Sequence, residues 1–134
     1  PTLDINQKSA INIATEAKRK GVEDFIFASS CSVYGTGGEK TKDELSDLDP
    51  LTNYAKSKIN SEIELEKLAD DKFKIKCLRF ATACGFSPRL RLDLVLNDFV
   101  ASAITSNKVK LLSDGKALRP LIDVLDMAGL FQEL

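Results

Sequence analysis

An uninterrupted apolar run, Phe25-Ile26-Phe27-Ala28, leaves few architectures open to this chain. Such a run is typical of a strand covered on both faces, as in a parallel sheet. We expect this strand over residues 22–28 and a second strand over residues 73–80. A helix over residues 52–69, with Thr52 or Asn53 as its N-cap, is expected between them. A strand, a helix and a second strand form a crossover that is right-handed in nearly all known cases, so the sequence predicts an α/β fold.

The spacing of apolar and turn-forming residues predicts the remaining elements. Helices are expected over residues 3–20 and 93–106, and another helix begins at Asp126. Residues 108–112 and 118–124 are predicted to be short strands, the second at a sheet edge because it contains Pro120. Residues 35–50, with a glycine cluster at 35, 37 and 38, and residues 81–91 are predicted to be loops.

The helix over residues 52–69 is expected to turn Ala55, Ile59 and Ile63 toward the sheet. Its acidic residues, Glu62 and Glu64 among them, are interpreted as a solvated face. This interpretation assigns no role in a site to either carboxylate.

Composition excludes several classes of protein. The formal net charge of −1 gives no electrostatic basis for binding nucleic acid or an anionic membrane. No apolar run approaches the ~20 residues of a membrane-spanning helix. The chain has no histidine, which excludes a Ser-His-Asp hydrolase and argues against a metal site. Cys31, Cys77 and Cys84 have no metal-ligand spacing, and we interpret them as core thiols of a cytoplasmic protein.

Two groups of side chains carry chemistry. Tyr54 and Lys58 are four residues apart and therefore lie on one face of their helix. A cation beside a phenol favours the phenolate, so such a pair can work as a proton shuttle. On its own the pair also fits a solvated helix face. However, Ser29 and Ser30 place hydroxyls at the end of the apolar strand upstream, and the two features together favour a site.

The strand ending in Ser30, followed by a loop and a Tyr-x-x-x-Lys helix, resembles the extended short-chain dehydrogenase/reductase family of NAD-dependent nucleotide-sugar epimerases and dehydratases. The resemblance implies that Ser30, Tyr54 and Lys58 are catalytic. It further implies NAD-binding and substrate-binding residues. The implied NAD-binding residues are Ser29, Tyr54, Lys58, Phe80 and Asn6, and the implied substrate-binding residues are Ser30, Thr82, Arg89 and Arg119.

The resemblance covers only the middle of the family's fold. No Gly-x-x-Gly-x-x-Gly loop is present, so we expect a fragment that binds NAD poorly and is inactive alone. Residues 1–86 correspond to the C-terminal half of a Rossmann-like, doubly wound parallel sheet. Residues 87–134 correspond to the beginning of a small substrate lobe. A strand that lacks one of its neighbours favours self-association, so we expect a dimer or a larger assembly.

The residues after Ser30 narrow the expected reaction. Related 4,6-dehydratases carry an Asp-Glu pair where this chain has Cys31 and Ser32, and related decarboxylases carry a glutamate in place of Ser32. The resemblance therefore implies an epimerase that acts on a nucleoside-diphosphate sugar with NAD. A reductase of keto sugars that uses NADP stays open, as does a non-catalytic module that associates with itself.

Overall fold

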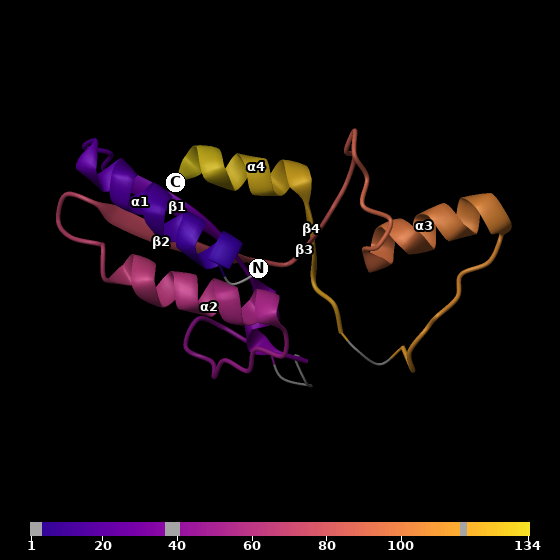
Figure 1. Cartoon of the computed structure of the whole chain (residues 1–134). Coiled ribbons are helices and arrows are strands. Elements are labelled where there is room, and N and C mark those ends of the chain that lie inside the picture. The colour runs from indigo at the N-terminus through magenta and orange to yellow at the C-terminus, as the bar shows by residue number, and fades with distance from the viewer. Residues whose placement is uncertain (1–3, 37–40, 116–117) are drawn as a thin grey trace. The chain divides into compact units, whose positions relative to one another are not determined.

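The computed structural model describes residues 4–36, 41–115 and 118–134. The chain divides into two compact units, Pro1–Phe80 and Ala81–Leu134, which we describe separately. Figure 1 shows the elements of both units. The boundary expected from the sequence lay at residues 86 and 87, and the roles assigned to the two parts stay a prediction. Part of the glycine cluster, at residues 37 and 38, lies outside the described residues.

The first unit is built on two parallel strands, β1 (Asp24–Ser30) and β2 (Lys74–Phe80). Their register pairs Asp24 with Lys74 at one end and Ser30 with Phe80 at the other. The predicted α/β class and the parallel pairing are confirmed. The first strand begins and ends two residues later than expected, because Ser29 and Ser30 continue the ladder.

Helices cover this sheet. A π-helical turn, η1 (Asp4–Lys8), leads into α1 (Ser9–Arg19), and α2 (Asn53–Glu66) connects the strands together with a 3-10 turn, η2 (Cys31–Tyr34). The N-cap of α2 is Thr52, whose Oγ1 accepts a hydrogen bond from the Ala55 amide at 3.1 Å.

Gly21 ends α1 in the left-handed region, with φ of 80°. The amide of Gly21 donates to the carbonyl of Lys18 at 3.0 Å, and the amide of Val22 donates to the carbonyl of Ala17 at 3.1 Å. These two bonds form a Schellman motif, which satisfies carbonyls at the end of the helix.

The core of the first unit consists of Ala14, Leu65 and Phe73, with Phe25 and Ile75 packed against it. The predicted inward stripe of α2 is only partly correct. Its buried residues are Ala55, Ser57, Ser61 and Leu65, while Ile63 is 48% exposed.

The serines explain why α2 is rotated in this way. Ser57 donates its hydroxyl hydrogen bond to the carbonyl of Tyr54 at 2.6 Å, and Ser61 donates to the carbonyl of Ser57 at 2.8 Å. Since a buried hydroxyl costs little once it is hydrogen-bonded, the helix can turn small side chains toward its neighbours.

Cys77 is exposed, and its interpretation as a core thiol is wrong. Cys77 lies on β2, an outer strand of the two-stranded sheet in the described part of the chain. The alternation predicted for this strand therefore does not bury every apolar residue, since Ile75 packs against the core and Cys77 is exposed.

The second unit contains β3 (Thr82–Cys84), α3 (Val95–Ser106), β4 (Leu121–Asp123) and α4 (Val124–Glu133). β3 and β4 pair in parallel. β3 falls in a predicted loop, and the strand predicted over residues 108–112 is wrong because that segment is irregular. α4 begins two residues earlier than expected, since the Asp123 carboxylate caps it by accepting from the Leu125 amide at 2.8 Å.

The apolar stripe predicted for α3 exists but is not covered within this unit. Val100 is 51% exposed and Ile104 is 77% exposed. None of the second unit's described residues is buried. Neither α3 nor any other helix in the described ranges combines the length and the apolar character needed to cross a membrane.

Candidate active site

The carboxyl ends of β1 and β2 meet at one edge of the sheet, where Ser30 is paired with Phe80. Open α/β sheets bind their ligands at this edge. The Ser30 hydroxyl caps η2 by accepting a hydrogen bond from the Ser32 amide at 3.2 Å. The hydroxyl oxygen of Ser32 is buried and has no hydrogen-bond partner among the described residues.

The first two turns of α2 carry Tyr54 and Lys58, and the Lys58 side chain reaches β1. The Lys58 Nζ atom lies 5.4 Å from the centroid of the Tyr54 ring and 4.8 Å from that of Phe27. It also donates a hydrogen bond to the carbonyl of Ala28 at 2.7 Å. The ammonium group is thus fixed between the helix and the strand that ends in Ser30. Tyr54 is 44% exposed, so a ligand can reach it.

The surroundings of Lys58 act on its charge in opposite directions. Partial burial lowers the pKa of Lys58, and the Glu62 carboxylate one helical turn away opposes that effect. Glu62, a residue that the sequence did not single out, therefore favours the ammonium form of Lys58.

The interpretation of Glu62 as part of a solvated face is wrong. The Glu62 and Arg79 side chains are only 11% and 20% exposed, and they form an ion pair with a shortest N–O distance of 2.7 Å. The hydrogen bond from Arg79 to Glu62 raises the pKa of the guanidinium. Two weak features of the sequence indicated this ion pair. Glu62 follows Lys58 by one helical turn, and Arg79 is a charged residue at the end of a strand.

The implied cofactor residues of the first unit lie in different surroundings. Ser29 is 5% exposed, and its hydroxyl donates a hydrogen bond to Glu62. Phe80 is buried at the end of β2. Asn6 is half-buried on η1, an element that contacts α2.

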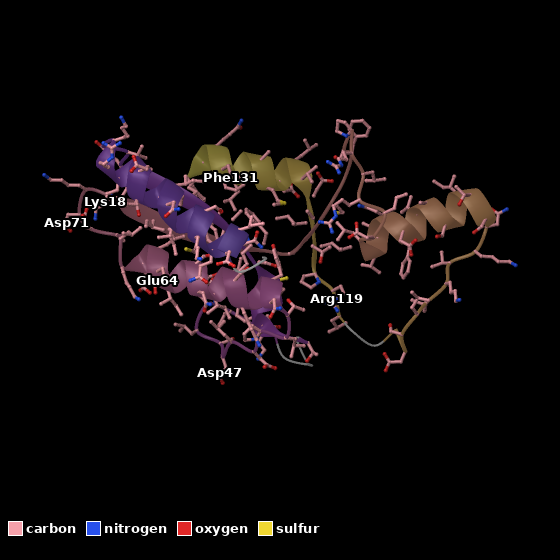
Figure 2. All side chains as sticks on the ribbon, in the orientation of Figure 1. Lys18, Asp47, Glu64, Asp71, Arg119 and Phe131 are labelled. Carbon is pink, nitrogen blue, oxygen red and sulfur yellow. The ribbon has the colours of Figure 1, made fainter. Side chains whose placement is uncertain are left out.

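The implied substrate residues Thr82, Arg89 and Arg119 belong to the second unit. The amide of Thr82 donates to the carbonyl of Pro120 at 3.1 Å, which brings the start of β3 beside the residue that follows Arg119. Arg89 and Arg119 are exposed. Figure 2 shows Arg119 on the segment that leads into β4. No group of side chains suited to hold a metal ion occurs among the described residues.

Comparison with known proteins gives one consistent result. The model of the family described as "NAD dependent epimerase/dehydratase" matches residues 1–132. An "uncharacterized UDP-glucose epimerase", YtcB of Bacillus subtilis (strain 168), is 30% identical over 120 residues, which are 87% of this chain and 37% of that protein.

Solved structures agree with the sequence comparison. TunA, an NAD-dependent NDP-hexosamine 5,6-dehydratase of tunicamycin biosynthesis, matches 97% of this chain with a TM-score of 0.82 and 25% identity. MoeE5 in complex with UDP-glucose and NAD matches 91% with a TM-score of 0.78 and 26% identity. This chain spans 43% of the TunA chain and 41% of the MoeE5 chain, so it corresponds to less than half of either.

Proposed function

The chain belongs to the NAD-dependent epimerase/dehydratase family, and we propose that it carries the catalytic part of an epimerase of nucleoside-diphosphate sugars. The contact of the Lys58 ammonium with the Tyr54 ring, beside the strand that ends in Ser30, is the observation that supports this proposal. The similarity to YtcB and to MoeE5, which was solved with UDP-glucose and NAD, supports the class of substrate.

NAD fits the residues of the first unit. The ammonium of Lys58, held beside the Ala28 carbonyl near the carboxyl end of β1, is a donor that could meet ribose oxygens. We assign Tyr54 and Lys58 to the cofactor site, together with Ser29, Phe80 and Asn6. When bound, NAD supplies a hydride acceptor that later returns the hydride.

The proton chemistry belongs to three side chains. Tyr54, as the phenolate, removes the proton of a sugar hydroxyl, and Lys58 stabilises that phenolate. Ser30 donates a hydrogen bond to the same sugar oxygen while it becomes a carbonyl. The sugar then turns its other face toward the cofactor, and Tyr54 returns the proton to the sugar oxygen. Arg119, Arg89 and Thr82 of the second unit bind the nucleotide, for which a planar guanidinium suits the phosphate oxygens.

The residues after Ser30 favour epimerisation over elimination of water. Cys31 and Ser32 form the first turn of η2, and neither supplies a carboxylate. Eliminating water needs a general acid for the leaving hydroxyl and a base for the carbon-bound proton. An epimerase needs only the hydroxyl proton to be moved, which Tyr54 can do alone.

Substitution of Tyr54 tests the proposal in the full-length protein. Tyr54→Phe removes the reacting oxygen and keeps the ring, so the rate of UDP-glucose epimerisation should fall by about 10²–10⁴-fold. The KM for the sugar nucleotide should change little. Chromatographic separation of UDP-glucose from its epimer over time measures this rate.

Two lysines of the same helix provide the control. Lys58→Met should reduce turnover strongly because it removes the cation beside Tyr54. Lys56→Met should leave turnover unchanged, since Lys56 is an exposed residue on the same helix. Wild-type turnover in Tyr54→Phe, or equal effects of the two lysine substitutions, would contradict the proposed roles.

A further inference from the structure

Glu62 and Arg79 form the most extensively bonded pair of charged side chains in the described part of the chain. The Arg79 Nη2 atom donates to Glu62 Oε2 at 2.7 Å, and the Arg79 Nε atom lies 3.1 and 3.2 Å from the two carboxylate oxygens. An ion pair shielded from water repays its desolvation only when its hydrogen-bonding geometry is good. This pair meets that condition, so Glu62 is held at a fixed position.

The ion pair also fixes the elements around it. Ser29, next to Ser30 on β1, donates its hydroxyl hydrogen bond to Glu62. Tyr34, the last residue of η2, accepts a hydrogen bond from Arg79 Nη1 at 2.9 Å, and its ring centroid lies 5.2 Å from the guanidinium carbon. Glu62 and Arg79 therefore connect α2 and β2 to both sides of Ser30.

Glu62 is also one helical turn from Lys58, with the same spacing that separates Lys58 from Tyr54. Partial burial lowers the pKa of Lys58, and the carboxylate of Glu62 acts against this. Our mechanism requires Lys58 as a cation. The carboxylate of Glu62 favours that charged form.

We propose that Glu62 is a positioning residue of the site. Arg79 holds the carboxylate of Glu62 in place. This carboxylate fixes the end of β1 through Ser29, and its negative charge stabilises the positive charge of the Lys58 ammonium. This inference rests on the proposed function in so far as Ser30, Tyr54 and Lys58 perform the chemistry. Glu62 acts through these residues and does not itself contact the substrate.

A purely structural role makes different predictions. An ion pair that only stabilises the fold would lower the melting temperature when it is removed, without changing the titration of Lys58. The groups that share the surroundings of Glu62 must be considered in that titration. These groups are Lys58 and Glu66 on α2, Arg79 and Cys77 on β2, and Tyr34 on η2. The charged residues of η1, Asp4 and Lys8, form an ion pair with each other at 2.5 Å.

The decisive experiment compares Glu62→Gln with Arg79→Gln in the full-length protein. Both variants break the ion pair, but they leave opposite charges behind. The side chain of Lys58 is followed by NMR in lysine-labelled protein, with Lys58→Arg used for assignment. Glu62→Gln should move the titration of Lys58 to lower pH. Arg79→Gln leaves a carboxylate without its cation and should move that titration to higher pH.

Kinetics give the second measurement. Glu62→Gln should lower kcat by up to about 10²-fold, the effect that a displacement of roughly 1 Å in an active site can cause, with little change in KM. The alkaline limb of its pH–rate profile should move to lower pH, since Lys58 loses its proton earlier. Glu64→Gln is the matched control, because Glu64 is on the same helix and pairs with exposed Lys67. Figure 2 shows Glu64 on α2.

Glu62→Asp separates position from charge and replaces Glu62→Gln if that variant does not fold. It keeps the carboxylate but withdraws it by one methylene, so kcat should fall while the titration of Lys58 stays near that of the wild type. A Lys58 titration that is the same in wild type, Glu62→Gln and Arg79→Gln would overturn the proposal, as would unchanged kcat in a folded Glu62→Gln. If the wild-type protein has no epimerase activity, the proposed function fails, and the NMR titrations still decide whether Glu62 controls Lys58.

Discussion

The two units of the chain differ in how they bury their apolar residues. Every buried residue in the described ranges belongs to Pro1–Phe80, where helices cover a parallel sheet. In Ala81–Leu134, α3 and α4 have apolar sides as well, yet neither has a buried residue. A helix with an apolar face is stabilised mainly by what packs against it. The first unit thus contains its own core, and the second unit contains apolar faces with little packed against them.

The same division separates the proposed roles. Lys58 is hydrogen-bonded to β1 and lies beside the Tyr54 ring inside the first unit, whereas Arg89 and Arg119 are exposed residues of irregular segments in the second. Chemistry depends on exact placement of a few atoms and is expected on rigid elements. Binding of phosphates tolerates longer and more mobile side chains. The comparison therefore predicts which kind of substitution is costly in each unit.

The largest effect on stability is expected in the core of the first unit. Leu65→Ala removes a fully buried side chain and should lower the free energy of unfolding by about 2–5 kcal/mol. Leu125→Ala, which removes the same atoms from a residue of α4 that is 78% exposed, should cost less than about 0.5 kcal/mol. Urea denaturation of the chain followed by circular dichroism measures both. Equal costs would show that the apolar side of α4 is covered in solution.

Arg119 tests the division of roles. Arg119→Met should weaken sugar-nucleotide binding by about 10–100-fold, because a hydrogen bond to a charged group contributes roughly 1.5–3 kcal/mol. The effect should appear in KM with little change in kcat, the reverse of the pattern expected for Tyr54→Phe. Initial rates in the full-length enzyme over a range of substrate concentrations separate the two constants. A fall in kcat alone would place Arg119 with the catalytic residues and break the division.

The smallest effects concern two glycines and should have opposite signs. Gly21→Ala puts a side chain into the left-handed region and should destabilise the first unit by about 1–2 kcal/mol. Gly129→Ala adds a methyl group within α4, where it meets no atom within 4 Å, and should stabilise that helix by about 0.5–1 kcal/mol. Thermal melting of the two variants measures both changes. A loss of stability in Gly129→Ala would indicate that another surface approaches α4 closely.

The features that were predictable from the sequence are those determined by neighbouring residues. The start of α2 and the end of α1 each depend on a few positions in a row. Thr52 was one of the two N-caps expected for α2, and α1 ends at Arg19, one residue before the expected end. The strand β3 was not expected from the sequence, because a strand of three residues forms only when it pairs with β4. The burial of Glu62 depends on Arg79, a residue of another element. The inward side of α2 likewise depends on which side chains the sheet can accept, and no local pattern contains that information.

The register of the β1–β2 sheet also determines when the first unit can fold. Every residue pair of this ladder is separated by fifty positions, from residues 24 and 74 to residues 30 and 80. Non-local pairing of this kind slows folding, because the intervening chain must be closed before the contacts form. A ribosome adds about 5–20 residues per second, so β1 waits roughly 3–10 s for its partner strand to be synthesised. During that interval the apolar run of Phe25–Ala28 is exposed in the nascent chain, and a chaperone could bind it there.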